Sequence, residues 1–274
     1  MGLGDNLRHP ARATLAVWQR LARSRSSATT NIFIACFPKS GSTFLYKTLH
    51  AVTGFDVESM TFRRKRNEQD MYLPTAADAA RKNSVTQQHV RATQPNLEML
   101  NEFNIRPVVL TRNIYDIVIS LRDHFYKQGQ NSPMLFVDDR FYELAESDQY
   151  DMIIDLALPW YFNFYVSWFE AQRTKAIDLL WTSYEEVMTD KAAAIKRILS
   201  FYSLPANESK IERILAEAEE KRKASRFNKG VSGRGAALLS DVQRMRVRQM
   251  TRFYPWVDFS LMGLAPQESK EQTQ

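Results

Sequence analysis

Residues 31–44, NIFIACFPKSGSTF, contain the segment that decides the fold. Asn31 to Phe37 is a short apolar run of β-branched and aromatic residues, and a proline and a glycine follow it closely. Such a run predicts a buried strand that ends in a tight turn. From Thr43 onward, apolar residues recur at helical spacing as far as Gly54, a residue typical of a helix stop. The segment therefore predicts a strand, a short glycine loop and a helix.

A second unit of the same kind begins at residues 107–110, PVVL. It turns at residues 111–113 and continues with an apolar helical stripe between Ile114 and Phe125. Between the two units, the patterns predict a helix at 75–82, an extended stretch at 84–90 and a helix at 95–103. Alternating strands and helices are typical of α/β proteins, so the sequence predicts a central parallel sheet flanked by helices.

The second half of the chain is predicted to be mostly helical. Its expected elements are a strand at 177–181 and helices at 151–173 (interrupted at Pro159), 191–202, 208–223 and 241–254. Three of the nine glycines, Gly230, Gly233 and Gly235, lie close together. This clustering predicts a loop whose backbone bends sharply or approaches a ligand closely.

The composition indicates a folded domain without disulfide bonds. The chain has 274 residues, of which 44% are hydrophobic, and a single cysteine, Cys36. One cysteine excludes an intramolecular disulfide and a cysteine-rich metal site, so a reducing cytoplasm is the expected location. No His, Asp or Glu cluster has metal-ligand spacing, so no metal is expected. No apolar run reaches the roughly 18 residues that a membrane span requires.

The two ends of the chain differ from its centre. Residues 1–30 carry five arginines and one acid, with apolar residues at helical spacing. They are expected to form a basic leader helix packed loosely on the domain, although a membrane-surface helix and an organellar transit peptide have similar compositions. Residues 265–274 are expected to be a polar, disordered tail. Residues 31–264 are left as one domain.

Basic residues are concentrated near the carboxyl end. The formal net charge of the chain is +6, whereas residues 221–252 contain ten Lys or Arg and one acid, Asp241. Such a segment indicates an anionic partner, such as nucleic acid, a phosphorylated cofactor or an acidic polymer. A non-catalytic binder of nucleic acid or acidic polymer is therefore one candidate function.

The loop after the first predicted strand has the composition of a phosphate cradle. Free backbone N–H groups and the positive end of the helix dipole point at one place in such a loop. Lys39 adds a full charge, and Ser40, Ser42 and Thr43 add hydroxyl donors. The lysine precedes Gly41, and no acidic partner for magnesium is evident, so the loop is not that of the P-loop nucleotide triphosphatases.

Residues 38–44, PKSGSTF, resemble the PKSGTTW loop of the sulfotransferases that use 3′-phosphoadenylyl sulfate (PAPS). Residues 112–120, RNIYDIVIS, resemble the second motif of that family, RNxxDxxxS. Both motifs occur in the family's order, each after an apolar strand. The resemblance implies a P-loop-like sulfotransferase fold, with PAPS as the sulfuryl donor. It also implies that the first motif holds the 5′-phosphosulfate and that Arg112 and Ser120 bind the 3′-phosphate.

Residues 226–235 resemble the family's late FRKGxxG loop, which closes over the 3′-phosphate. Lys229 and Gly230 match this loop, whereas Asn228 stands where the family has an arginine. The candidate replacements for that charge are Arg226 and Arg234.

Two aromatic residues are candidates for contact with the adenine. Phe44 stands where the family's loop has a tryptophan, and it keeps a ring but not the indole N–H. Tyr184 resembles the tyrosine of the family's YED segment, which lies beside the adenine. A core tyrosine at a strand end is the alternative for Tyr184.

The resemblance also implies the catalytic groups. Lys39 is expected at the bridging oxygen, where negative charge develops on the departing phosphate. A histidine suits the base, since its ordinary pKa is ~6.5. His89 lies 23 positions before Arg112 and matches the family's catalytic histidine in order and approximate distance. His124 is the runner-up, and a carboxylate is the base in some carbohydrate members. Gln87 stands where the family has a lysine.

Acceptor recognition is expected from residues 55–73 and 125–150, which carry no family signal. The basic run at 62–66 suits an anionic glycan or lipid headgroup, with a solvated loop as the alternative. A hydroxyl on a carbohydrate or lipid-linked sugar is the first expectation for the acceptor, and a small alcohol or phenol is the second. Nucleic acid is not expected as a partner, and peripheral membrane contact through the leader stays open.

Overall fold

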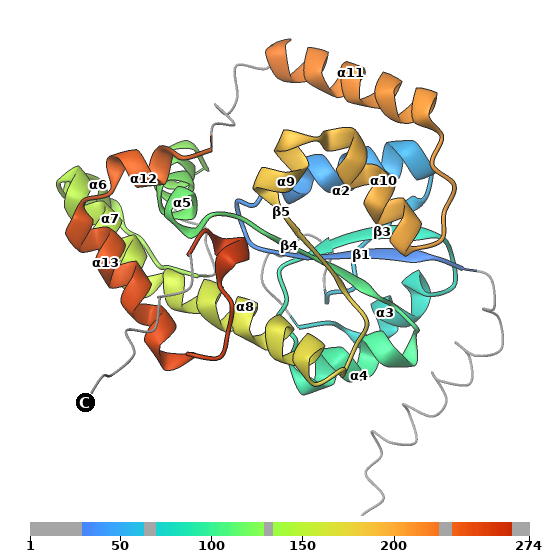
Figure 1. Cartoon of the computed structure of the whole chain (residues 1–274), viewed down its shortest axis with the longest axis horizontal. Coiled ribbons are helices and arrows are strands. Elements are labelled where there is room, and N and C mark those ends of the chain that lie inside the picture. Colours follow the sequence, from blue (N-terminus) through green and yellow to red (C-terminus); the bar gives the residue numbers. More distant parts are fainter. Residues whose placement is uncertain (1–28, 63–69, 129–133, 225–231, 265–274) are drawn as a thin grey trace, which may run out of the picture.

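The computed structural model of the chain describes residues 29–62, 70–128, 134–224 and 232–264. Its centre is a five-stranded sheet in the order β2-β3-β1-β4-β5 (Figure 1). All neighbouring strands are parallel. The strands are β2 (Asp56–Glu58), β3 (Ser84–Gln88), β1 (Asn31–Cys36), β4 (Pro107–Thr111) and β5 (Leu180–Ser183). The predicted α/β fold with a central parallel sheet is confirmed.

The apolar run that opened the sequence forms the middle strand, β1. All six of its residues are buried. Phe33 and Ala35 face one hydrophobic core, whereas Ile32, Ile34 and Cys36 face a second core on the other side of the sheet. A parallel strand covered on both faces needs apolar residues at every position, which is why this run shows no polar alternation.

Helices cover both faces of the sheet (Figure 1). On the face of Ile34 lie α2 (Ser42–Thr53), α9 (Tyr184–Thr189), α10 (Lys191–Phe201) and α11 (Glu208–Ala224). On the face of Phe33 lie α3 (Leu73–Ala79), α4 (Gln94–Glu102) and α8 (Leu158–Arg173). The same core continues into α5 (Ile114–Gln128), α6 (Asp139–Glu143) and α7 (Glu146–Leu156). The chain then adds α12 (Arg234–Leu238), α13 (Asp241–Gln249), η1 (Met250–Phe253) and η2 (Ser260–Met262).

Some element boundaries differ from the sequence prediction. The strand predicted at 177–181 lies at 180–183, because Ile177 and Leu179 are buried without joining the sheet. The helix predicted at 241–254 ends at Gln249 and continues as the 3-10 turn η1. The helix predicted over 151–173 is interrupted as expected, but the break lies at Ala157, between α7 and α8, and Pro159 lies in the first turn of α8, where a missing N–H is tolerated. The short elements β2, α6, α9 and α12 were not predicted.

The leader at 1–28, most of the basic run at 62–66 and the tail at 265–274 lie outside the described residues. The expectations about their structure stay predictions. None of the helices in the described part of the chain is long and apolar enough to span a membrane.

Candidate active site

Four residues singled out in the sequence lie just past the carboxyl ends of neighbouring strands. Lys39 lies in the loop after β1, His89 follows β3, Arg112 follows β4 and Tyr184 follows β5. The carboxyl ends of parallel strands meet at one edge of a sheet, where ligands bind in open α/β proteins. The fold therefore brings these four residues to one place.

The loop between β1 and α2 is held in a sharp bend. Both Lys39 and Gly41 have positive φ, at 69° and 79°. The Ser40 hydroxyl donates a 2.7 Å hydrogen bond to the Phe37 carbonyl, so it stabilises the bend. The Ser42 hydroxyl accepts a 2.8 Å bond from the Gln87 amide. The Phe44 N–H bonds to the Gly41 carbonyl at 3.0 Å, whereas the N–H groups of the two helix residues before it have no carbonyl one turn back within the helix. Such donors suit an anion, and the phosphate cradle stays a prediction.

The ring of Tyr184 packs against the loop between β1 and α2. It packs so closely on Gly41 that a Cβ atom there would lie 2.7 Å from the ring. The guanidinium of Arg112 also lies over the Tyr184 ring, with its central carbon 4.3 Å from the ring centroid. Tyr184 is buried, as a core tyrosine at a strand end would be, and it also shapes the site. Its predicted contact with adenine stays a prediction.

Arg112 joins the two motifs. One of its terminal nitrogens donates a 2.9 Å hydrogen bond to the Lys39 carbonyl, and the other lies 3.9 Å from the Asp116 carboxylate. Its Nε is buried and has no hydrogen-bond partner among the described residues. A buried guanidinium N–H without a partner is costly. This atom therefore fits a bound anion at the same place.

Lys39 lies in a crowded, positive environment. Burial lowers its pKa, and the neighbouring charges of Arg112 and Lys127 act in the same direction, while Asp123 opposes them. Its ammonium nitrogen lies 3.3 Å from Nδ1 of His124 on α5. An anionic ligand would relieve the repulsion between these cations.

His89 is buried beside the loop, and its Nδ1 lies 2.8 Å from the Cys36 carbonyl oxygen. A carbonyl only accepts, so Nδ1 carries the proton and Nε2 keeps the lone pair. Burial lowers the pKa of His89, and the charge of Lys39 adds to this effect. The ring is therefore neutral near pH 7, as a base requires. Burial also raises the pKa of the Cys36 thiol to about 12, so it is a packing group and not a nucleophile.

The helix after Arg112 brings further polar groups to the loop. Ser120 is partly buried and lies one turn before His124, on the same face of α5. The predicted contact of Ser120 with the 3′-phosphate stays a prediction. Phe44 is only half-buried, and the Lys191 ammonium lies 5.8 Å from its ring centroid, while Thr43 is exposed.

The glycine cluster packs against the second motif through Asp116, to which the sequence assigned no role. The Asp116 carboxylate accepts hydrogen bonds from the N–H groups of Gly233, at 2.8 Å, and Gly235, at 2.7 Å. Arg234, between them, donates to Asp123 and is engaged there. Asn228, Lys229 and Gly230, like Arg226, lie outside the described residues, and their assignment stays a prediction.

Glu185 is another functional candidate that the sequence did not reveal. Its carboxylate accepts a 3.1 Å hydrogen bond from the Asn113 N–H, which ties α9 to the start of the second motif. Burial raises the pKa of Glu185. The only sequence signal for this role was its place directly after Tyr184.

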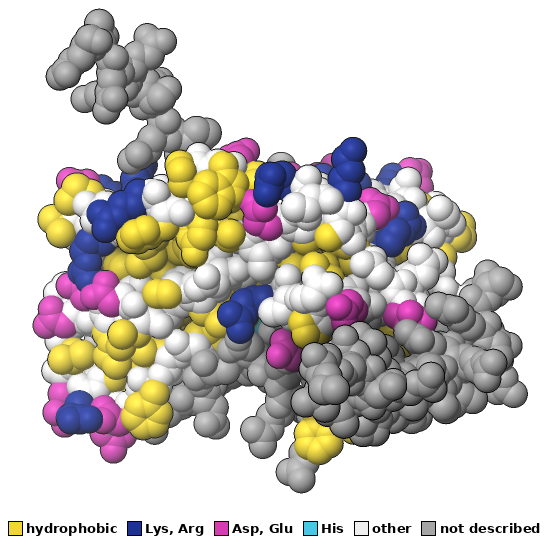
Figure 2. All heavy atoms as spheres, turned by 90° about the horizontal axis from the view of Figure 1, so that it is seen from below, with side chains coloured by type: hydrophobic (Ala, Val, Ile, Leu, Met, Phe, Trp, Pro, Cys, Tyr) yellow, Lys and Arg dark blue, Asp and Glu magenta, His cyan; other side chains and the backbone are white. Residues whose placement is uncertain are grey.

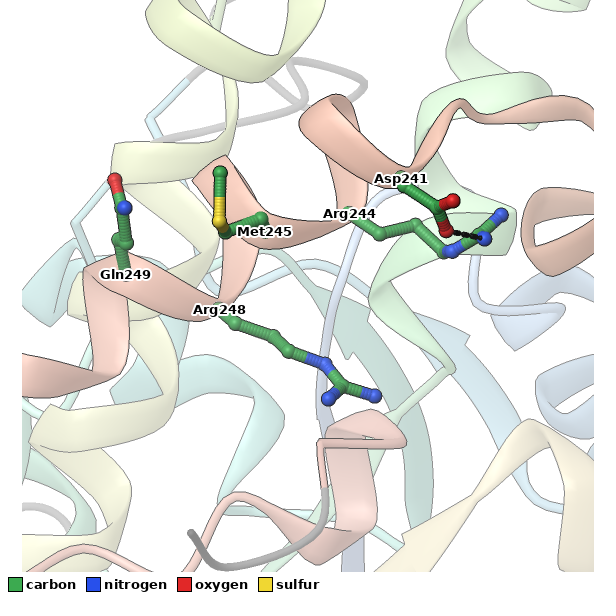
Figure 3. A pocket seen from close by; sticks show the side chains of 5 residues that line it. All are labelled: Asp241, Arg244, Met245, Arg248 and Gln249. Atoms are coloured by element: carbon green, nitrogen blue, oxygen red, sulfur yellow. Dashed lines mark hydrogen bonds and ion pairs between the residues drawn. The ribbon is translucent and has the colours of Figure 1, made fainter.

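In the described part of the basic segment near the carboxyl end, three arginines pair with acids, namely Arg234, Arg244 and Arg246. Arg244 binds Asp241, and Arg246 binds both Asp151 and Asp155. Figure 3 shows a pocket of about 610 Å³ along α13, in which the Asp241–Arg244 pair lies beside Met245, Arg248 and Gln249. On the face in Figure 2, Lys and Arg side chains are interspersed with Asp and Glu. This pairing weakens the case for a nucleic-acid surface.

Among the residues that the structure describes, no group of three or more His, Cys, Asp or Glu side chains is placed to hold a metal ion. The positive groups at the strand ends are side chains of Lys39 and Arg112. The strand ends therefore bring together two side-chain cations, a bent loop and a neutral histidine.

A parallel sheet with such a loop after its middle strand defines a P-loop-like α/β protein. The chain belongs to the sulfotransferase family, because the family model for the sulfotransferase domain matches residues 29–244. This confirms the family inferred from the two motifs. No curated protein sequence matches the chain.

Two solved proteins share the fold over most of their length. Mouse sulfotransferase SULT7A1, crystallised with PAP, superimposes with a TM-score of 0.63 at 18% identity, over 90% of this chain and 92% of that one. Retinol dehydratase, crystallised with PAP and either retinol or androsterone, gives a TM-score of 0.54 at 12% identity, over 88% and 85%. The P-loop-like sulfotransferase fold is thus confirmed.

Proposed function

We propose that the protein is a PAPS-dependent O-sulfotransferase, which moves a sulfuryl group to an acceptor hydroxyl. The observation that carries this proposal is the buried Arg112, whose unpartnered Nε points to a bound anion beside the bent loop. PAPS would supply the activated sulfuryl group. Family membership and the PAP bound to similar folds support this donor.

The residues at the strand ends divide the binding of PAPS. The loop from Lys39 to Phe44 would hold the 5′-phosphosulfate through backbone N–H groups and the ammonium group. Arg112 and Ser120 would hold the 3′-phosphate, together with Asn228, Lys229 and Gly230. Phe44 and Tyr184 would lie beside the adenine. Lys39 would also neutralise charge on the departing phosphate oxygen.

His89 is proposed as the base. Its Nδ1 is committed to the Cys36 carbonyl, which leaves the Nε2 lone pair to remove the proton of the acceptor hydroxyl. The bond to the carbonyl fixes both the tautomer and the ring orientation. Burial keeps the ring neutral, so the pKa of His89 favours the form that accepts a proton.

The acceptor is proposed to be a polar alcohol, with a hydroxyl on a carbohydrate or lipid-linked sugar favoured. Asp123, His124 and Lys127 of α5 lie close enough to affect or contact Lys39, so this side of the site is polar. A polar wall favours a sugar over an apolar ring. A small alcohol or phenol is the second choice. Cytoplasmic location and membrane contact through the leader stay predictions.

Calorimetry with two nucleotides tests the proposal. Arg112→Lys should weaken binding of 3′-phosphoadenosine 5′-phosphate by roughly 1 to 3 kcal/mol, because the charged hydrogen bond offered by Nε is lost. Binding of AMP, which lacks the 3′-phosphate, should hardly change. Arg106→Lys is the matched control, since Arg106 precedes β4 and Arg112 follows it. Equal losses for both nucleotides would mean that Arg112 supports the fold or the 5′ side.

A further inference from the structure

The contact between Lys39 and His124 joins the loop after β1 to the second half of α5. Lys39 Nζ lies 3.3 Å from His124 Nδ1, and the two residues are 85 positions apart in the chain. An ammonium group donates hydrogen bonds and never accepts them. Nδ1 of His124 therefore carries the lone pair, and the proton of the neutral ring is on Nε2.

Few groups are placed to accept a hydrogen bond from Lys39. Arg112, after β4, and Lys127, on α5, repel it, and Asp123 attracts it. The Asp123 carboxylate, however, already accepts a 2.8 Å bond from Arg234. The hydrogen bond that His89 makes, after β3, runs from its Nδ1 to the Cys36 carbonyl and not to Lys39. Among the described residues, His124 is thus the one acceptor recorded for the Lys39 ammonium group.

His124 is suited to this task because it stays neutral. Burial lowers its pKa to about 4, and the charge of Lys39 acts in the same direction. Near neutral pH the ring is an acceptor, whereas a protonated ring would repel the ammonium group. The ring also packs against Phe125, with centroids 6.2 Å apart, which restricts its orientation.

We propose that His124 is a positioning residue for Lys39. Its Nδ1 holds the ammonium group beside the bent loop and directs it to the phosphosulfate of the donor. This inference rests on the proposed sulfotransferase function. It also gives the two histidines different roles. Nε2 of neutral His124 carries a hydrogen, whereas Nε2 of His89 has a lone pair that can accept a proton.

Two variants of His124 separate the effect of its hydrogen-bond acceptor, Nδ1, from the effect of its ring. His124→Phe keeps a ring against Phe125 but removes the acceptor, and His124→Asn removes the ring but keeps an amide oxygen near the place of Nδ1. The first measurement is labelling of Lys39 with an amine-reactive reagent at a series of pH values, read by mass spectrometry. Lys47, exposed on α2, is the internal control. The second measurement is of kcat and KM for sulfuryl transfer from PAPS to a hydroxyl-bearing substrate.

In H124F, the pKa of Lys39 from the labelling curve should fall by roughly 0.5 to 1, because a neutral hydrogen bond to the charged form is lost. The kcat should fall roughly 10- to 100-fold, since a misplaced catalytic group is slow, with little change in acceptor KM. H124N should restore both values toward wild type. His124→Leu replaces H124F if the phenyl variant does not fold.

An unchanged labelling curve in H124F, or an H124N variant as defective as H124F, overturns the proposal. Failure of the wild-type protein to transfer a sulfuryl group would contradict the proposed function instead. The labelling curves still decide the Lys39–His124 contact in that case, because they need no turnover.

Discussion

The backbone N–H of Gly235 donates a 2.7 Å hydrogen bond to the Asp116 carboxylate, across 119 residues of chain. The contact is so close that a Cβ atom on Gly235 would lie 2.2 Å from the carbonyl carbon of Tyr115. Gly233 adds a second bond to the same carboxylate. One acidic side chain thus fixes the start of α12 against the second motif, next to Arg112.

Gly235→Ala is expected to destabilise the protein by roughly 1 to 3 kcal/mol or more, because the new methyl group meets backbone that cannot move aside. Gly233→Ala is the control. It has open space around the Cβ position but a φ of 86°, so it should cost only about 1 kcal/mol. Urea unfolding compares the two. Equal stabilities would show that the close approach of α12 to α5 is not maintained in solution.

Gly41→Ala should weaken nucleotide binding, because the added methyl group would lie 2.7 Å from the Tyr184 ring. A strain of roughly 1 to 3 kcal/mol corresponds to a roughly five- to 150-fold loss of affinity for 3′-phosphoadenosine 5′-phosphate. Gly54→Ala, at the other end of α2, has a similar φ of 75° and nothing within 4 Å. Its affinity should match wild type in calorimetry. A similar loss in both variants would point to backbone strain alone.

His89→Asn is expected to reduce kcat on the order of 100-fold or more, since removing a general base commonly has such an effect. The amide can still donate to the Cys36 carbonyl, so nucleotide affinity should stay close to wild type. His50→Asn, on the exposed side of α2, is the matched control and should keep full activity. If the His89 variant keeps its rate and its pH profile, another group is the base.

Stability should fall as the solution becomes acidic, because two rings are held neutral in the folded state. Burial lowers the pKa of His89, and it lowers that of His124 to about 4. Below about pH 6.5 the unfolded chain takes up protons at these rings before the folded chain does. The contribution of these two neutral rings to the free energy of unfolding is therefore complete above that pH, and it is lost as the pH falls toward 4.

Urea unfolding at about pH 7.5 and about pH 5 measures this effect. His124→Phe should lose less stability between the two values than wild type, since one of the two rings is gone. Identical losses in both proteins would show that His124 does not stay neutral in the folded state.

The strands around the site could be predicted because they lie in the sheet interior, where even a short run is apolar without alternation. β1 and β4 are buried at every position. Gly54 ends α2 as predicted, with φ at 75° and its N–H on the His50 carbonyl. β2 could not be predicted, because two of its three residues, Asp56 and Val57, are exposed at the edge of the sheet and show no apolar pattern.

The candidate site was most predictable where its residues follow strands. Lys39, His89, Arg112 and Tyr184 meet because parallel strands end at one edge, and each of them could be placed after a predicted strand or extended stretch. The bonds from Gly233 and Gly235 to Asp116 join segments more than a hundred residues apart, and no local pattern encodes them. The contact of Lys39 with His124 also joins distant segments, 85 positions apart, and no local pattern encodes it.

The middle position of β1 in the sheet has a consequence for synthesis on the ribosome. β1 is the first of the described strands to be made, but its partners β3 and β4 come later in the chain, and Tyr184, which shapes the loop at Gly41, comes later still. About 145 residues separate Lys39 from Tyr184, which corresponds to roughly 7 to 30 seconds of translation. During that interval β1, which is buried at every position in the folded protein, lacks a complete sheet, and an exposed apolar strand of this kind is prone to aggregation.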